Sequence, residues 1–297
     1  MAGQLKEVRN RIKSVQNTQQ ITKAMKMVSA AKLRRAQDSI IQMRPYAKKL
    51  RELLAHIIGG YAGDIDMGLV ALAVERPVEK VLIISITSDR GLAGAYNSNI
   101  IKLTKHTINT NYSEQFRKGN VTIWAIGKKG YEHFLKNKFK VDDSYRDLFL
   151  KLAFDEVHVA AQAAVKGFLN KEFDAIEVVY SEFKNAATQK FVVERFLPIA
   201  RLTPQPGTKK AEFILEPSKS QLIAELVPKI LNTQLFKAVL DANASEHGAR
   251  MTAMDKASEN ANDILKTLRI SYNRARQAAI TTELTEIVSG AAALQGS

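Results

Sequence analysis

Residues 5–42, LKEVRNRIKSVQNTQQITKAMKMVSAAKLRRAQDSIIQ, contain neither proline nor glycine. Their apolar side chains recur at steps of three and four residues, with one slip in the register near Gln19. The spacing predicts one long amphipathic helix with an imperfect heptad repeat. Its apolar positions are Leu5, Val8, Ile12, Val15, Ile21, Met25 and Val28.

The same helix is predicted to continue to residue 58, with Pro45 as its only proline. At 1.5 Å per residue it would be on the order of 80 Å long, which is too long for a compact domain. The segment IGGYAGDIDMG, residues 58–68, carries four glycines and ends the helical pattern. We therefore expect an N-terminal coiled-coil helix over 1–58 and a linker over 59–77.

A second long helix is predicted at the other end of the chain, over residues 218–297. Pro228 is expected to kink this helix or to mark its first turn. A helix of about 70 residues would be on the order of 100 Å long. Two such helices must cover each other's apolar stripes, and an antiparallel coiled coil is the simplest arrangement. The second stripe includes Leu222, Leu226, Ile230, Leu235, Ile264, Leu268, Ile280, Leu284, Ile287 and Val288.

The middle of the chain, residues 78–200, alternates β-rich runs with helical patterns, which predicts an α/β domain with a largely parallel sheet. The last two runs are separated only by KNAATQ and predict an antiparallel hairpin. The fold class is therefore α/β, with a long antiparallel coiled coil flanking a small Rossmann-like domain, and residues 201–217 form a second linker. The runs are KVLIISITSD (80–89), NVTIWAIG (120–127), DAIEVVYSEF (174–183) and KFVVERFLPI (190–199).

Composition narrows the possible functions. The chain has no cysteine, which excludes disulfides and cysteine nucleophiles, and no uninterrupted apolar run of about 18 residues, so any membrane association is expected to come through a partner. Residues 1–52 hold thirteen Lys or Arg against three acids. This positive field attracts an acidic protein surface, a nucleic acid or anionic lipid. Because residues 5–42 contain no aromatic side chain for base stacking, we favour the acidic protein surface.

The stretch ISITSDRGLAGAYNSN, residues 84–99, passes from a strand through a glycine-containing turn into a helix, as phosphate-binding loops do. Its spacing matches neither the dinucleotide fingerprint nor the P-loop. A docking turn is the favoured interpretation, and a nucleotide-dependent enzyme centred on this loop stays an alternative. A basic coiled coil that binds nucleic acid is a third hypothesis.

No catalytic or metal site is expected. The five histidines are scattered without an H-x-x-x-H pair, and Asp142 and Asp143 lie in a polar stretch typical of a solvated loop. Near the C-terminus, Arg276, Gln277, Thr281 and Glu283 lie within about two helical turns and are expected to present a polar band.

Three motifs together resemble the gamma subunit family of ATP synthases, and the resemblance covers nearly the whole chain. RIKSVQNTQQITKAMKMVSAAKLRRAQ (11–37) and SDRGLAGAYN (88–97) match in the expected order. ITTELTEIVSGAAA (280–293) is similar to the family signature. Its fixed positions correspond to Thr281, Glu283, Glu286, Gly290 and Ala291.

This resemblance implies the rotor shaft of a proton-translocating ATP synthase. The two long helices would turn inside a ring of alternating alpha and beta subunits, and the α/β domain and the foot of the coiled coil would meet the epsilon subunit and the ring of c subunits. Catalysis would belong to beta, so the chain is expected to be non-catalytic, with no cofactor, no small-molecule substrate of its own and no nucleic acid. It would be peripheral on the cytoplasmic side of the cell inner membrane, touching the membrane only through the complex.

The resemblance also assigns two sets of contact residues. Two positions depart from the family pattern, because Ala93 stands where many relatives have cysteine and Gln20 where many have lysine. The second departure removes one possible contact near an acidic lever of beta. The set expected at a catch loop of beta is Arg276, Gln277, Thr281 and Glu283, and the set expected at the acidic lever is Lys23, Met25, Lys26 and Arg90.

Overall fold

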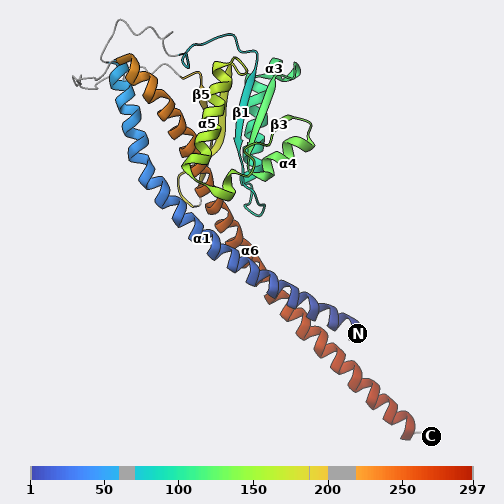
Figure 1. Ribbon diagram of the computed structural model, residues 1–297. Coiled ribbons are helices and arrows are strands. Elements are labelled where there is room, and N and C mark those ends of the chain that lie inside the picture. The colour runs from blue at the N-terminus through green and yellow to red at the C-terminus, as the bar shows by residue number, and fades with distance from the viewer. Residues whose placement is uncertain (1, 60–70, 187, 200–218, 296–297) are drawn as a thin grey trace. The chain divides into compact units, whose positions relative to one another are not determined.

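A computed structural model describes residues 2–59, 71–186, 188–199 and 219–295 (Figure 1). The chain divides into two compact units, one made of Met1–Ser29 with Met251–Ser297 and the other of Ala30–Arg250. The predicted linkers 59–77 and 201–217 lie largely outside the described residues, and the five-part domain division stays a prediction. Among the described residues, no helix combines the length and the apolar character needed to cross a bilayer.

The long helices α1 (Ala2–Gly59) and α6 (Lys219–Gln295) confirm the α-helical ends of the predicted fold. Pro45 lies inside α1 and Pro228 inside α6, so Pro228 does not mark the first turn of its helix. The first turn of α1 contains no acidic residue, and neither end of α6 carries a charge suited to the helix dipole. These helices therefore depend on tertiary packing more than on their termini.

In the first unit the two helices pair antiparallel, and polar contacts define their register. The Thr22 and Ser258 hydroxyl oxygens lie 2.7 Å apart, and the Lys26 ammonium lies 2.5 Å from the Asp255 carboxylate. Residues later in α1 therefore contact residues earlier in α6, as an antiparallel pair requires. The series continues with Gln19 donating to Asn262, and with Arg9 donating to the Tyr272 hydroxyl at 2.9 Å.

The second unit contains a five-stranded sheet in the order β3-β2-β1-β4-β5, in which only β5 is antiparallel to its neighbour. The predicted parallel sheet and final hairpin are both confirmed. The three-residue strand β3 was not predicted, because it is too short to show a periodic pattern. The strands are β1 (Val81–Ile86), β2 (Val121–Ile126), β3 (Lys140–Asp142), β4 (Ala175–Phe183) and β5 (Gln189–Leu197).

Both faces of the sheet are covered, and for this reason every residue of β1 is buried. One face packs against α2 and α4, through side chains such as Ile100 and Phe134. The other face packs against α5 and the first half of α6. The remaining helices are α2 (Tyr96–Asn111), α3 (Ser113–Arg117), α4 (Lys128–Lys136), α5 (Phe154–Leu169) and the 3-10 turn Leu148–Lys151.

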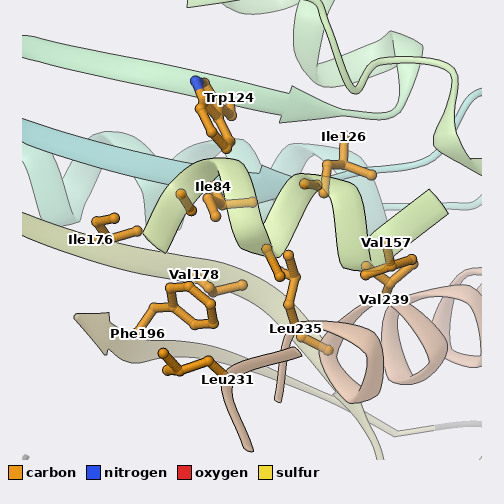
Figure 2. Packing of buried hydrophobic residues seen from close by; sticks show 14 of the residues in the cluster. Ile84, Trp124, Ile126, Val157, Ile176, Val178, Phe196, Leu231, Leu235 and Val239 are labelled. Atoms are coloured by element: carbon orange, nitrogen blue, oxygen red, sulfur yellow. The ribbon is translucent and has the colours of Figure 1, made fainter. Parts of the chain in front are cut away.

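Figure 2 shows how α6 becomes part of the domain core. Leu231, Leu235 and Val239 of α6 lie beside Val157 of α5 and Phe196 of β5, all almost completely buried. Burying a Leu or Val side chain stabilises the fold by about 1.5 to 3 kcal/mol. The first half of α6 is therefore a structural element of the α/β domain as well as half of a helix pair.

Candidate partner-contact surfaces

The connection from β1 to α2 forms a tightly bonded turn, which we call the Arg90 turn (residues 88–91). The Ser88 hydroxyl donates to the Arg90 carbonyl at 2.7 Å, while its backbone N–H donates to the Asn97 side-chain oxygen at 2.9 Å. The side chain of Arg90 is exposed, and it forms no ion pair with any residue that the structure describes. The turn therefore presents a free guanidinium on a fixed backbone.

The carboxyl end of β1, where a doubly wound sheet would bind a nucleotide, is occupied by the protein's own groups. Three amides at the start of α4 are already used: Lys128 N–H donates to the Asp89 carboxylate at 3.2 Å, Lys129 N–H to the Ser88 carbonyl at 3.0 Å and Gly130 N–H to the Thr87 hydroxyl at 2.9 Å. A phosphate at this edge could use these three amides only by displacing the protein's own acceptors. The arrangement favours a docking turn over a nucleotide loop.

A side chain from α6 completes the Arg90 turn. Arg250, only 8% exposed, donates to the Arg90 carbonyl at 2.9 Å and to the Gly91 carbonyl at 3.3 Å. Its other terminal nitrogen lies 2.5 Å from the carboxylate of Glu246, one helical turn earlier. Tyr96 adds a further contact, donating from its hydroxyl to the Ala242 carbonyl at 2.9 Å. The backbone of the turn is thus tied to α6.

Burial controls the protonation of this cluster. Desolvation raises the pKa of Glu246, although Arg250 opposes the shift. Desolvation also lowers the pKa of His247 to about 4, and the positive charges of Arg250 and Lys32 act in the same direction. His247 is therefore neutral in the folded protein at neutral pH, and Arg250 has only one carboxylate, Glu246, within ion-pair distance among the described residues.

We expect the contribution of His247 to stability to fall as the pH falls from about 6.5 towards 4, because His247 then binds a proton only when the chain unfolds. The depressed pKa gives a loss of about 3 kcal/mol in the free energy of unfolding across this window. Urea unfolding of the wild type and His247→Gln at a series of pH values measures it. Glu246 has the opposite pH dependence in both proteins, so only their difference reports on His247, and parallel curves would contradict the prediction.

The residues predicted at the acidic lever differ in their availability. Lys23 is exposed and Met25 is half-buried. Lys26 instead forms its ion pair with Asp255, with side chains 42% and 46% exposed. An exposed pair of this kind contributes about 0.2 to 1 kcal/mol, so a strong outside carboxylate can replace Asp255.

The predicted polar band near the C-terminus is divided between two helix faces. At about 100° per residue, Arg276 and Glu283 share one face, whereas Gln277 and Thr281 share a neighbouring one. All four are exposed, and the Thr281 hydroxyl donates to the Gln277 carbonyl at 3.0 Å. This part of α6 also exposes large apolar side chains, namely Ile280, Leu284, Ile287 and Val288, which are 49%, 58%, 68% and 67% exposed.

Sequence reasoning missed the contribution of α6 to the Arg90 turn. Arg250 and Glu246 have the spacing of an ordinary exposed helical ion pair, so their sequence gives no sign of burial. The one available signal was the small residues that accompany them, Ala244, Ser245 and Gly248, which allow close approach. A Cβ at Gly248 would lie 3.1 Å from the Ala186 carbonyl oxygen.

Comparisons with known proteins cover nearly the whole chain. A family model described as ATP synthase matches residues 4–294. The ATP synthase gamma chain of Cytophaga hutchinsonii is 50% identical over 293 residues, which is 98% of each chain. The ATP synthase gamma chain of Flavobacterium johnsoniae is 49% identical over 292 residues, covering 98% of this chain and 99% of the relative.

Two solved structures of Euglena gracilis mitochondrial ATP synthase share the fold. The match to its rotor has a TM-score of 0.64 at 20% identity, and covers 94% of this chain and 100% of that chain. The match to a chain of its OSCP/F1/c-ring assembly has a TM-score of 0.66 at 20% identity, and covers 99% of this chain and 95% of that chain.

Proposed function

Because the chain belongs to the ATP synthase gamma chain family, we propose that it is the central rotor shaft of a proton-translocating ATP synthase. It transmits torque from the rotating c ring to the catalytic beta subunits and catalyses no reaction itself. The observation that carries this proposal is the sequence similarity to gamma chains, which reaches 50% identity over 293 residues and so covers nearly the whole chain.

The helix pair has the mechanical properties that such a shaft requires. Two paired helices are stiff along their length, and their surface differs from one side to the other. Turning them presents different faces to three otherwise equivalent beta subunits. Each beta conformation is then selected by its differential contact with the shaft, as any ligand-driven change of conformation requires.

The exposed tip of α6 supports a ring of alpha and beta subunits as the partner. Ile280, Leu284, Ile287 and Val288 lie within about 100° of one another around the helix, and all are exposed in the isolated chain. An apolar stripe of this kind is stabilised by removal from water. An apolar sleeve formed by the ring would provide that environment.

We also propose the remaining partners and the contact residues by analogy with the gamma chain family. The α/β domain and the foot of the coiled coil meet the epsilon subunit and the c ring, on the cytoplasmic side of the cell inner membrane. Lys23, Met25, Lys26 and Arg90 contact the acidic lever of beta. Exposed Arg90 and Lys23 support this assignment most directly, because neither has an ion-pair partner among the described residues. At the catch loop, the contacts come from Arg276, Gln277, Thr281 and Glu283.

Reconstitution tests the proposal. We expect a complex assembled with alpha, beta, epsilon and the membrane sector to synthesise ATP from a proton gradient only when this chain is included. The purified chain alone should hydrolyse no ATP. Substantial hydrolysis by the chain, together with tight nucleotide binding in calorimetry, would instead support an enzyme centred on the Arg90 turn. DNA or RNA binding that weakens steeply with salt would support the nucleic-acid hypothesis.

A further inference from the structure

We propose that Arg250 is a positioning residue that locks the Arg90 turn to α6, so that the force received by the Arg90 side chain passes directly into the shaft helix. The inference rests on the proposed contact between Arg90 and beta. It adds a residue that does not touch beta and acts only through the backbone of the turn.

The contacts of the Arg90 turn divide into two classes. The first class holds Ser88 and Asp89 and comes from the α/β domain, namely from the Asn97 side chain and the amides of Lys128 and Lys129. The contacts to the Arg90 and Gly91 carbonyls from outside the turn come from Arg250, as far as the described residues go. The part of the turn that carries the exposed guanidinium is therefore tied to α6, in addition to its internal bond from the Ser88 hydroxyl.

Arginine is the side chain that this position requires. Its terminal nitrogens bind two neighbouring carbonyls through Nη2 while Nη1 binds the Glu246 carboxylate. A lysine has one compact ammonium group and cannot reproduce this planar, divided geometry. Arg250→Lys keeps the charge and loses the geometry, which makes it a precise probe of the proposal.

The surroundings of Arg250 make its contacts strong and exclude water. Both Arg250 and Glu246 have side chains 9% exposed. Hydrogen bonds from an ionised donor are stronger than those between neutral groups, and they are strengthened in a site of low dielectric. Removing Arg250 alone would leave a buried carboxylate without its partner. Other ionisable groups that influence the cluster are Lys32 of α1, Asp89 of the turn, His247 and Tyr96.

Two variants separate the lock from a general loss of stability. Arg250→Lys keeps the buried charge pair, and the double variant Glu246→Gln/Arg250→Gln removes both charges and leaves amides of similar size. The matched control is Lys237→Gln/Asp241→Asn. That pair also lies at i, i+4 on α6 and is largely buried, at 3.4 Å, but it is not in contact with the turn.

Hydrogen exchange measures the lock directly in the purified complex. We expect amides in peptides covering residues 88–97 to exchange at least about tenfold faster in both Arg250 variants, because one lost charge-assisted hydrogen bond corresponds to a factor of this size. Exchange within β1 and in the second half of α2 should not change, and neither should exchange of residues 88–97 in the control. Unchanged exchange of this segment in both variants would overturn the proposal.

A double-mutant cycle then tests whether Arg250 acts through Arg90. The readout is ATP-driven proton pumping per ATP hydrolysed, measured for Arg250→Lys, Arg90→Gln and the combination. If the lock works through the turn, the combination is no worse than Arg90→Gln alone. Losses that multiply would show an independent role and overturn the proposal. If Arg90→Gln alone has no effect while exchange still rises in Arg250→Lys, the beta contact has failed and the lock itself stands.

Discussion

Arg90→Glu is expected to reduce ATP-driven proton pumping per ATP hydrolysed at least several-fold, whereas Arg90→Lys should retain most of it. The side chain is exposed and has no ion-pair partner among the described residues, so its charge is available to the acidic lever of beta that we propose as its partner. Reversal replaces an attraction across an interface by repulsion, a change of about 1 to 3 kcal/mol. Comparing pumping with hydrolysis in reconstituted vesicles measures the ratio.

The matched control for Arg90→Glu is Lys118→Glu. Lys118 is also exposed, and follows α3 at the amino end of β2, whereas Arg90 follows the carboxyl end of β1. This change alters the net charge equally and should leave the ratio unchanged. Equal losses in Arg90→Glu and Arg90→Lys, or an equal loss in Lys118→Glu, would show that the effect is not a specific charge contact. Circular dichroism confirms that each variant is folded.

Gly127→Ala is expected to have the largest effect on stability, lowering the free energy of unfolding by about 3 kcal/mol or more. Gly127 has φ +95°, which L side chains rarely adopt. A Cβ there would overlap with the Thr87 carbonyl group. The backbone that leads into the Arg90 turn would therefore have to move. Urea unfolding followed by circular dichroism measures the loss.

Gly119→Ala separates the two causes. Gly119 has φ +74°, but nothing lies within 4 Å of a Cβ built there. Only the backbone penalty of about 1 kcal/mol should appear. A similar loss in both variants would mean that the close approach of Thr87 to Gly127 does not contribute. A larger loss of stability in Gly127→Ala would show that steric overlap with Thr87, where β1, β2 and α4 meet, adds to the backbone penalty.

Several elements of the α/β domain support the backbone beneath the exposed Arg90 side chain. The backbone N–H of Thr87 donates to the Ile126 carbonyl of β2, and α2 and α4 hold Ser88. The Lys128 amide of α4 binds Asp89, and α6 binds the carbonyls of Arg90 and Gly91. A force on Arg90 is therefore opposed by several elements at once. We expect a torque-transmitting contact to need such support, because a mobile loop would absorb the force in its own rearrangement.

Much of the fold could be predicted from local patterns. The three- and four-residue spacing from Leu5 onwards predicted α1, and the β-rich runs predicted four of the five strands and their final hairpin. Such patterns depend on neighbours within a few residues, and they act before any tertiary contact forms. The strand β3, only Lys140–Asp142, has too few residues to show a period.

The contact residues were only partly predictable. Exposure of Arg90, Lys23 and the α6 tip agrees with their expected availability, although their contacts with beta stay proposals. The polar band near the C-terminus divides between two helix faces once a period of 3.6 is applied. The pairing of Lys26 with Asp255 could not be predicted from the sequence, because it depends on the register in which α1 packs against α6.

The sequence by itself determined the two long helices, the α/β domain between them, the positive field of the N-terminal segment and the family. Each of these depends on periodicity, composition or motifs that are read along the chain. Only the tertiary structure decided how the backbone of the Arg90 turn is held. The Asp89 carboxylate and the Ser88 carbonyl accept hydrogen bonds from amides of α4, and the Arg90 carbonyl binds Arg250, a residue 160 positions away. A buried charge takes whichever partner folding brings to it, and no local pattern encodes that choice.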